Sequence, residues 1–366
     1  MKVLYVISGI GYGDSTREHA NILALKKLFP NTRIMIAGYD NSYRYFKDKY
    51  PTVKIQGYKL PGKNMKINVL IFGLRNLLLP LHWLFSTLKV PLYTSKFIPD
   101  LIISDFEPAG ISLAKLLQKK CIVVFGFDPL LYREYAQKHK VNYKMWIEAK
   151  YFEKLYHQAD VVIIPTFKRN TSDYGQYKYV NPIVRQKRDE LPSELKIAEQ
   201  LKIKKKPILI MLGGSEFGTK LAQSLNNLAG EFKEEQFIIF GSNLNFDTAV
   251  NVKYLRYSDN FLKYLKISKG VITLAGQETL AEALSYEKPI LCFPIQNHIE
   301  QVLNAYALRK IALISSDSSP KIIRQQLSEF IRQLPQLKQK VKRYNLKANG
   351  AEQVADIIEN ILLKNR

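Results

Sequence analysis

Two successive series of alternating apolar and helix-like segments constrain the fold of this 366-residue chain more than any other feature. In the first series, the apolar segment 3–8 leads into the turn GIGYG and then into residues with helical periodicity. Further apolar segments occupy 33–38, 100–105, 121–127 and 160–165. These segments are apolar throughout, which is typical of strands covered on both faces. The pattern predicts an α/β fold with a parallel, doubly wound sheet.

The alternation stops at 181–207, a polar and basic segment with three prolines, and restarts at 207–214. Later apolar segments at 236–242, 270–276 and 289–295 again have helix-like segments between them. A length of 366 residues also favours two domains over one. We therefore expect two Rossmann-like domains, residues 1–183 and 184–366, and a last amphipathic helix at about 352–364.

The charge of the chain is strongly basic, with 55 Lys and Arg against 32 Asp and Glu and a formal net charge of +23. Such a field attracts nucleic acid, phospholipid headgroups or phosphorylated substrates. No nucleic-acid-binding motif accompanies it, so we expect no nucleic acid partner. The 51 residues from Lys49 to Pro99 contain eight Lys or Arg and neither Asp nor Glu.

Within this acid-free stretch, residues 63–98 form a basic apolar insertion in the first domain that contains Trp83. Arg75 and Pro80 interrupt it too often for a transmembrane span. An in-plane pair of helices with basic flanks would suit an anionic membrane surface. A helix pair packed on the sheet of the first domain, and a contact between two copies of the chain, are the alternatives.

The location of the protein is indicated by its cysteines and its first residues. Cys121 and Cys292 lie in apolar, strand-like segments, which is typical of buried thiols in a reducing compartment. The segment MKVLYVIS lacks the longer apolar region of a signal peptide. We expect a cytoplasmic protein that is peripheral on the inner face of the cell membrane.

A glycine turn follows the first strand of each half. The first contains Gly11 and Gly13, and the second contains Gly213, Gly214 and Ser215. Glycine lets the backbone approach a ligand, and the next helix offers free N–H groups to a phosphate, although such turns also occur with nothing bound. A dinucleotide-binding turn is disfavoured because Asp14 replaces its third glycine, and a carboxylate there repels a pyrophosphate.

The stretch 273–305 gathers a second group of polar residues. A strand ends at Gly276, and the next helix begins at about Gln277 with Thr279 in its first turn and Glu282 three residues later. Such a helix start suits a diphosphate, and Glu282 suits a ribose diol. The residues that follow the next strand, where doubly wound sheets bind ligands, include Gln296, Glu300 and Gln301. A capped surface helix with a polar loop is the alternative.

The order of these segments resembles that of the GT-B glycosyltransferases. Residues 273–305 are similar to the donor-binding signature of nucleotide-sugar transferases related to the lipid-II-pathway N-acetylglucosaminyltransferase. SGIGYGDSTRE and SDFEP resemble an uncharacterised archaeal-type branch of that group. The resemblance covers most of the chain. It implies two domains facing across a cleft, with the acceptor in the first, the UDP-sugar donor in the second, and the last helix crossing back to the first.

The resemblance also implies an activity and a role for each candidate. Glu282 would contact the ribose hydroxyls, Glu300 and Gln301 the hexose, and the diphosphate or uridine would lie against Gly213, Gly214, Ser215 and Thr279. The expected reaction moves a hexose or N-acetylhexosamine from a UDP-sugar to an acceptor hydroxyl, which we expect to be lipid-linked, with inversion. A UDP-sugar epimerase of the same fold and a non-catalytic relative that binds sugar nucleotides or phospholipid are the alternatives.

Asp14 departs from the related enzymes, many of which have a histidine base at this position. A carboxylate also removes a proton if burial raises its pKa. Asp14 is therefore either the base or a cap on a helix that begins at Ser15, and the two roles are compatible. His19 is a weaker candidate for the base, because a histidine inside a helix is more often packed against its neighbours.

Asp105 and Glu107 form a second carboxylate pair after their strand, and either would serve as the base or bind acceptor hydroxyls. Their spacing is a poor match to the Asp-x-Asp of metal-dependent transferases, and neither zinc-ligand spacing nor a Walker loop is present. We therefore expect no metal and no cofactor, with the UDP-sugar as co-substrate. The helix dipole and backbone N–H groups would stabilise the leaving diphosphate.

Overall fold

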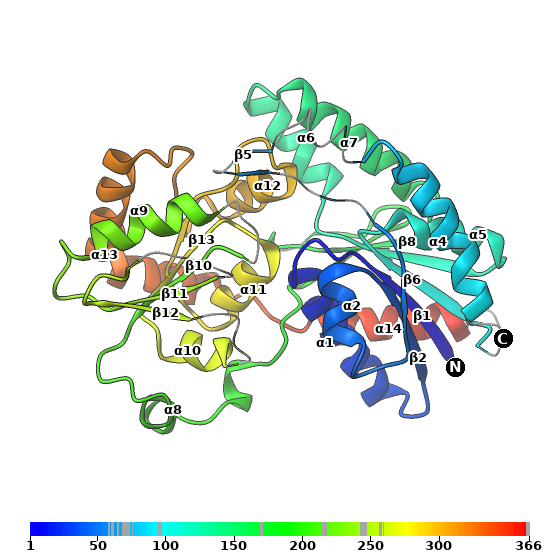
Figure 1. Cartoon of the computed structure of the whole chain (residues 1–366), viewed down its shortest axis with the longest axis horizontal. Coiled ribbons are helices and arrows are strands. Elements are labelled where there is room, and N and C mark those ends of the chain that lie inside the picture. Colours follow the sequence, from blue (N-terminus) through cyan, green and yellow to red (C-terminus); the bar gives the residue numbers. More distant parts are fainter. Residues whose placement is uncertain are drawn as a thin grey trace. The chain divides into compact units, whose positions relative to one another are not determined.

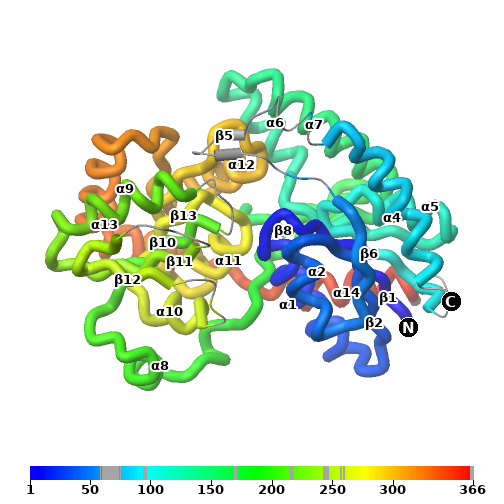
Figure 2. Tube along the Cα trace, in the orientation of Figure 1, coloured from blue at the N-terminus to red at the C-terminus, as the bar shows by residue number. Residues whose placement is uncertain are grey.

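The structure is a computed structural model that describes residues 1–57, 59, 62–63, 66–67, 74, 76–93, 97–168, 171–213, 218–241, 247–255, 258 and 260–363. The chain divides into two compact units (Figure 1). The first unit comprises residues 1–61, 68–185 and 349–366, and the second comprises 62–67 and 186–348. The C-terminal segment of the chain therefore belongs to the first unit, as Figure 2 shows by its red trace among blue and cyan elements.

The first unit is built on a seven-stranded parallel sheet with the order β3-β2-β1-β6-β7-β8-β9. Its strands are β1 (Lys2–Ile7), β2 (Arg33–Gly38), β3 (Thr52–Lys54), β6 (Leu101–Asp105), β7 (Lys120–Val124), β8 (Val161–Pro165) and β9 (Tyr177–Val180). Its helices are α1 (Gly13–Leu28), α2 (Asp40–Phe46), α4 (Leu79–Tyr93), α5 (Pro108–Leu116), α6 (Pro129–Lys138), α7 (Tyr143–Tyr156) and α14 (Gly350–Leu363). The register pairs Ile7 with both Gly38 and Asp105, so β1, β2 and β6 end at one edge of the sheet.

One core of the first unit joins the beginning and the end of the chain. It contains fully or nearly buried side chains of β1, α1 and α14, among them Val3, Tyr5, Ile7, Ile22, Leu25, Val354 and Ile358. Burying an aliphatic side chain of this kind contributes roughly 1.5–3 kcal/mol. The C-terminal helix is therefore held in the first unit by the apolar face that its sequence periodicity creates.

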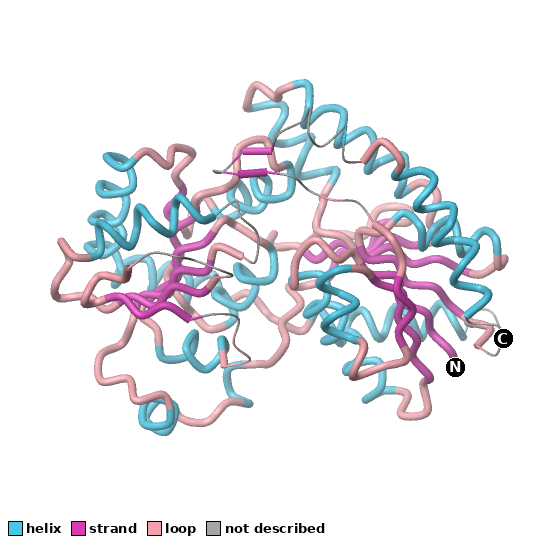
Figure 3. The backbone as a smooth tube through the Cα atoms, viewed as in Figure 1, coloured by secondary structure: helices cyan, strands magenta, loops and turns pink. Residues whose placement is uncertain are grey.

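The second unit is built on a six-stranded parallel sheet with the order β12-β11-β10-β13-β14-β15 (Figure 3). Its strands are β10 (Ile208–Met211), β11 (Phe237–Phe240), β12 (Val252–Leu255), β13 (Gly270–Thr273), β14 (Ile290–Cys292) and β15 (Leu313–Ile314). Its helices are η1 (Arg188–Glu190), α8 (Glu194–Gln200), α9 (Thr219–Ala229), α10 (Phe261–Ile267), α11 (Gln277–Ser285), α12 (Ile299–Leu308) and α13 (Pro320–Tyr344). A short antiparallel pair, β4 (Gly62–Lys63) and β5 (Lys66–Ile67), is grouped with this unit.

The predicted α/β fold with two parallel sheets is confirmed. Cys121 and Cys292 are both buried in strands, as expected. The predicted start of the first helix is wrong: α1 begins at Gly13, not at Ser15. Among the helices that the structure describes, none is long and apolar enough to cross a membrane.

Candidate active-site residues in the two units

The glycine turn of the first unit lies between β1 and α1. Gly9 packs directly on the start of α2, because a Cβ atom there would lie 2.0 Å from the carbonyl oxygen of Tyr39. At Gly11, by contrast, a Cβ atom would come no closer than 3.9 Å to the nitrogen of Gly13, the first residue of α1. The turn is therefore held tightly on one side and has open space at Gly11.

Asp14 lies in the first turn of α1 and is joined to a buried arginine. Its Oδ1 accepts a hydrogen bond of 2.8 Å from Nη2 of Arg17, one helical turn later. The N-cap residue of α1 is Tyr12, and it provides no side-chain cap. Asp14 is thus inside the helix and does not occupy the predicted capping position. Its side chain is 20% exposed, whereas that of Arg17 is only 3% exposed.

Asp105 occupies the other side of the same guanidinium. Nη2 of Arg17 donates to its Oδ1 at 2.6 Å and Nε to its Oδ2 at 3.0 Å, which makes the contact bidentate. Asp105 is fully buried. Both of its oxygens accept from Arg17 inside the unit, so Asp105 positions Arg17 and, through Arg17, Asp14. Its role as base or acceptor ligand stays a prediction.

A second buried carboxyl group belongs to this cluster. Glu18 has no exposed surface, and its Oε1 accepts from Nδ2 of Asn21 at 3.1 Å. Burial raises the pKa of Glu18 and of Asp105, and Arg17 opposes this change at both groups. The nearby charge of Glu18 raises the pKa of Asp105 further.

His19 packs among aromatic rings of the first unit. Its Nδ1 lies 2.9 Å from the hydroxyl of Tyr45, and its ring makes edge contacts with Tyr45, Phe46 and Tyr50. Burial and the nearby Lys49 lower the pKa of His19. These contacts support the interpretation of His19 as a packed residue.

Glu107 follows β6 and is the N-cap of α5. Its Oε1 accepts from the backbone N–H of Ala109 at 3.4 Å, and the residue is 1% exposed. Burial raises the pKa of Glu107 to about 8, while Ala109, Trp83 and Tyr39 stabilise its charged form. Glu107 is therefore a buried capping group that changes protonation near neutral pH, and no contact of its carboxyl group with solvent supports a direct role in acceptor binding.

Sequence reasoning missed Arg17, Glu18 and Tyr39. The hydroxyl of Tyr39 lies 3.2 Å from Oγ of Ser8. Burial raises the pKa of Tyr39, and the nearby charges of Glu107 and Asp14 raise it further. Arg17 was detectable in part, because residues three apart on a helix lie on one face and Asp14 precedes it at that spacing. Its main partner, Asp105, is 88 residues away along the chain and leaves no local signal.

In the second unit, the glycine turn after β10 begins at Gly213. Its φ of +74° is in the left-handed region that favours glycine, and a Cβ atom there would meet nothing within 4 Å. The next helix, α9, begins after Gly218. The other two predicted residues of this turn, Gly214 and Ser215, lie outside the described residues.

The start of α11 has an N-cap glycine with open space around it. Gly276 is the N-cap and gives no side-chain cap, and a Cβ atom on it would meet nothing within 4 Å. Thr279 is half-buried in the first turn, whereas Gln277 and Glu282 are each 3% exposed. Ala275, with a φ of +66°, is held by a hydrogen bond of 3.2 Å from Nδ2 of Asn304 to its carbonyl oxygen.

The loop after β14 lies at the same edge, because Thr273 and Cys292 are register partners in parallel strands. Gln296 is exposed, and its amide nitrogen lies 3.4 Å from the carbonyl oxygen of Ser316. Glu300 is half-buried in the first turn of α12. Oε1 of Gln301 accepts from the backbone N–H of Ile295 at 2.9 Å, so this oxygen shapes the loop itself.

The parallel strands of the second unit thus bring the predicted residues of 273–305 to one edge. The first unit brings Asp14 and Glu107 to the carboxyl ends of β1 and β6. Within the described parts of the chain, no group of three or more His, Cys, Asp or Glu residues is arranged to hold a metal ion.

Both units have the architecture of the GT-B class of glycosyltransferases, with a parallel α/β sheet in each and candidate residues at the strand ends. The solved structure of the spinosyn forosaminyltransferase SpnP is similar to it over 99% of both chains, with a TM-score of 0.67 and 16% sequence identity.

The chain belongs to glycosyl transferase family 1, whose model matches residues 1–335. An uncharacterized glycosyltransferase of Methanosarcina mazei is 24% identical to it over 98% of each chain. The UDP-N-acetylglucosamine–N-acetylmuramyl-(pentapeptide) pyrophosphoryl-undecaprenol N-acetylglucosamine transferase of Thermosipho africanus is 26% identical over 88% of this chain and 87% of its own. The resemblance seen in the sequence is confirmed, and the protein is a glycosyltransferase.

Proposed function

We propose that this glycosyltransferase moves a hexose or N-acetylhexosamine from a UDP-sugar to an acceptor hydroxyl, with inversion of the anomeric centre and without a metal ion. The observation that carries the donor assignment is the open start of α11 at Gly276. Uncapped N–H groups and the positive end of the helix dipole favour a diphosphate there. The name of the Thermosipho africanus relative includes a UDP-sugar, which supports UDP as the carrier.

Glu282 gives the sharpest test of the donor site. It lies one turn into α11, where a carboxylate would accept hydrogen bonds from both ribose hydroxyls. Glu282→Ala should weaken UDP binding by about 1–3 kcal/mol, the usual cost of leaving polar partners unsatisfied. Isothermal titration calorimetry with UDP measures this loss. The control is Glu231→Ala, which removes an exposed carboxylate paired with Arg324 in the same unit. Equal UDP affinities in the two variants would refute the assignment.

Asp14 is the proposed general base. It is the carboxylate of the Arg17 cluster that reaches solvent, and Arg17 fixes one of its oxygens. In the reaction, a carboxylate oxygen of Asp14 takes the acceptor hydroxyl proton while the hydroxyl oxygen bonds to the anomeric carbon. The bond from that carbon to the diphosphate oxygen breaks, and UDP leaves with the electron pair. The start of α11 and the Gly213 turn would stabilise the charge on UDP.

A product assay separates transfer from its alternatives. Transfer releases UDP only when an acceptor is present, whereas an epimerase would form an isomeric UDP-sugar without an acceptor. A binding protein would form neither product. Incubation of the purified chain with UDP-sugars and polyprenyl-linked or soluble acceptors, followed by chromatography of the nucleotide products, gives a distinct result for each.

The acceptor is proposed to be lipid-linked because of an exposed apolar face on α4. Leucine and phenylalanine side chains at helical spacing are 49–77% exposed along this helix: Leu81, Leu84, Phe85, Leu88 and Leu92. Ser86, Thr87 and Val90 are buried on its other face. An exposed apolar face of this kind favours an interface with a membrane or another protein.

Basic and aromatic residues near α4 favour an anionic membrane as the occupant. Lys89 lies on the helix itself, 5.3 Å from the centre of the Tyr93 ring. In the same unit, α7 exposes Tyr143 and Trp146, whose rings stack at 5.8 Å, with Lys150 one turn beyond. Tyrosine, tryptophan and lysine are the residues preferred at the interface between lipid and water.

The exposure of individual side chains shows which residues of this segment are suitable probes of membrane binding. The expected pair of in-plane helices at 63–98 lies partly outside the described residues, and the helix described there is α4. The indole nitrogen of Trp83 is buried near Glu107, so Trp83 is a poor probe of the surface. Leu84 and Phe85 are better probes, being 52% and 65% exposed.

We expect the protein to co-sediment with vesicles of anionic phospholipid at low salt, and less at high salt, because screening reduces the reach of surface charge. Leu84→Gln with Phe85→Gln should reduce binding at least about fivefold, since two large apolar side chains leave the lipid. Leu195→Gln, which changes an 85% exposed leucine of the second unit, is the control. Equal binding of the double variant and the control would favour a contact between protein chains.

A further inference from the structure

A cavity in the second unit lies at the opposite edge of its sheet from Gly276. The cavity has a volume of about 300 Å³. Its lining includes residues one or two positions before three parallel strands: Lys206 before β10, Lys269 before β13, and Lys288 before β14. The four residues of β13 separate this edge from the proposed donor edge by about 13 Å. A ligand in the cavity would therefore not occupy the donor site.

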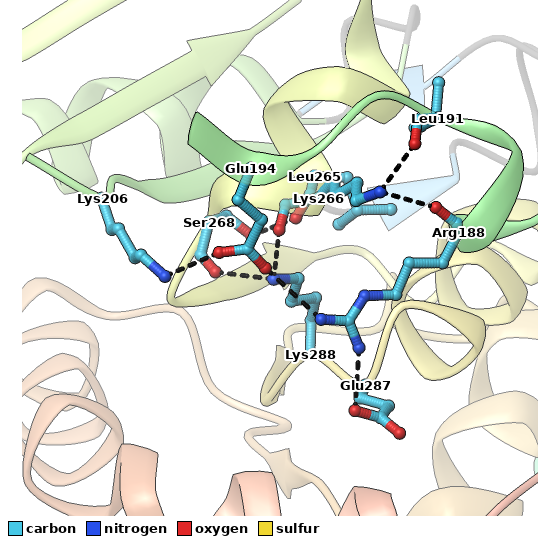
Figure 4. Close-up of polar contacts among 9 residues, drawn as sticks. All are labelled: Arg188, Leu191, Glu194, Lys206, Leu265, Lys266, Ser268, Glu287 and Lys288. Carbon is cyan, nitrogen blue, oxygen red and sulfur yellow. Dashed lines mark hydrogen bonds and ion pairs between the residues drawn. The ribbon is translucent and has the colours of Figure 1, made fainter. Parts of the chain in front are cut away.

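The wall of this cavity carries an excess of positive charge. Its basic side chains are Arg188, Lys206, Lys269, Lys288 and Lys338, and its acidic side chains are Glu194 and Glu287. Arg188 forms ion pairs with both carboxylates, at 3.3 Å to Glu194 and 2.9 Å to Glu287 (Figure 4). Lys206 also pairs with Glu194 at 2.7 Å, and Lys269 pairs with Glu235 at 2.6 Å.

Among the described residues, two cations of the wall, Lys288 and Lys338, form no ion pair with a carboxylate, although the charge of Glu194 acts on Lys288. Lys338 of α13 makes no ion pair or hydrogen bond with any of the described residues. Nζ of Lys288 donates to the carbonyl oxygens of Lys266 and Ser268, at 2.7 and 2.9 Å, at the carboxyl end of α10. When protonated, a lysine has a third N–H to donate.

The charges around Lys288 act on its protonation. Burial is the main cause that lowers the pKa of Lys288 to about 7; the charge of Glu194 opposes this change, and the charges of Arg188, Lys206 and Lys338 add to it. Glu287, next in the chain, is already paired with Arg188. Placing an anion beside Lys288 would favour its protonated form and relieve the repulsion from Lys338.

The cavity also borders the segment that enters the second unit. Nζ of Lys266 donates to the carbonyl oxygens of Arg188 and Leu191, both at 2.9 Å. The hydroxyl of Tyr286 donates to the carbonyl oxygen of Gln186 at 3.0 Å. Residues 186–191 are thus fixed to α10 and α11 by side-chain hydrogen bonds. Arg188 belongs both to this segment and to the cavity wall.

We propose that this cavity is a binding site for a small phosphate-type oxyanion, held between Lys288 and Lys338 and separate from the donor site. A volume of about 300 Å³ is at the lower end of small-molecule sites and accommodates a diphosphate or the phosphate of a small metabolite. Arg188 keeps the two wall carboxylates paired, which limits their repulsion of the anion. The proposal does not depend on the identity of the sugar donor.

Calorimetry with inorganic pyrophosphate on the full chain, in the presence of saturating UDP, tests the site. Lys338→Met should weaken pyrophosphate binding about five- to tenfold, because it removes one charge-assisted contact. The matched control, Lys340→Met, removes the same charge from an exposed position on α13 that does not line the cavity. A parallel titration with glucose 1-phosphate distinguishes free diphosphate from a phosphate ester as the preferred ligand.

Proton uptake gives a second readout. Titration with sulfate, which does not itself titrate near neutral pH, in two buffers of different ionisation enthalpy at pH 7.5 should show proton uptake by wild type. Lys288→Met should abolish it. Equal pyrophosphate affinities in the Lys338 and Lys340 variants, failure of wild type to bind at millimolar concentration, or loss of binding on adding UDP would each overturn the proposal.

Discussion

The two units differ in the buried ionisable groups near their candidate sites: the first buries carboxyl groups, and the second buries a lysine. In the first unit, Asp105 and Glu18 are buried beside the guanidinium of Arg17, and Glu107 is buried at the N-cap of α5. In the second, Lys288 is buried where carbonyl groups end a helix. Burial moves both kinds of group toward neutrality: the pKa of Glu107 rises to about 8 and that of Lys288 falls to about 7.

The difference lies in what compensates the buried charge. Arg17 gives Asp105 a bidentate ion pair, so the charge of both groups is retained inside the first unit. Among the described residues, the hydrogen-bond acceptors of Lys288 are neutral carbonyl oxygens, and the nearby charges are those of Glu194, which favours its protonated form, and of Arg188, Lys206 and Lys338, which oppose it. We infer that the first cluster is fixed internally and presents Asp14, whereas the second has unsatisfied affinity for an anion. Four substitutions test this contrast.

The largest effect is expected at Asp14. Asp14→Asn keeps the size of the side chain and an oxygen for Arg17 but is unable to accept a proton. Turnover should fall by about 10²–10⁴ with UDP affinity nearly unchanged, as measured by UDP release and by calorimetry. Asp48→Asn, at an exposed side chain of the same unit, is the control. Full turnover in Asp14→Asn would exclude its role as the base, and loss of UDP binding would indicate a structural defect.

The next largest effect is expected when Arg17 is replaced. Arg17→Met leaves Asp105 buried without its ion pair, and removing one partner of such a pair costs about 3–5 kcal/mol. Urea denaturation should show this loss. Arg17→Lys should recover only part of it, because an ammonium does not reproduce the bidentate contact. If the double variant Arg17→Met with Asp105→Leu is no more stable than Arg17→Met alone, the buried charge is not the cause.

These two residues also show what was predictable from the sequence. The strands β1, β6 and β13 were predictable because their residues are apolar on both faces, which is a local pattern. The open turn at Gly276 was predictable from a strand followed by glycine and a helix. The Arg17–Asp105 pair was not, because the contact depends on the register of β1 with β6. Burial of Asp105 likewise depends on helices that pack from distant parts of the chain.

An intermediate effect is expected at Glu107, and it should depend on pH. Its folded-state pKa of about 8 lies above the ordinary value of 4.5, so the folded state binds the proton more tightly. The contribution of Glu107 to the free energy of unfolding is therefore fully present below pH 4.5, and it is lost as the pH rises through about 8. Glu107→Gln removes this dependence. The variant should gain up to about 3 kcal/mol relative to wild type between pH 5 and pH 8 in urea denaturation. Parallel pH profiles for the two proteins would contradict the raised pKa.

The smallest effect is expected at Lys338, where the change acts through repulsion at a partly screened surface. Lys338→Met removes one cation that lowers the pKa of Lys288. Because Lys288 is protonated below pH 7 in the folded state, repulsion between the two lysines is largest there and disappears as Lys288 loses its proton at higher pH. The variant should be more stable than wild type by about 0.2–1 kcal/mol at pH 6 and low salt, and by less at pH 9 or in 1 M salt. Urea denaturation under these three conditions measures the difference.

Phosphate added at pH 6 should make wild type more stable than the variant, because the bound anion makes Lys338 stabilising in wild type alone. A variant that remains more stable than wild type in phosphate would mean that the two lysines repel each other without sharing an anion, and the contrast between the two units would then rest on the first cluster alone.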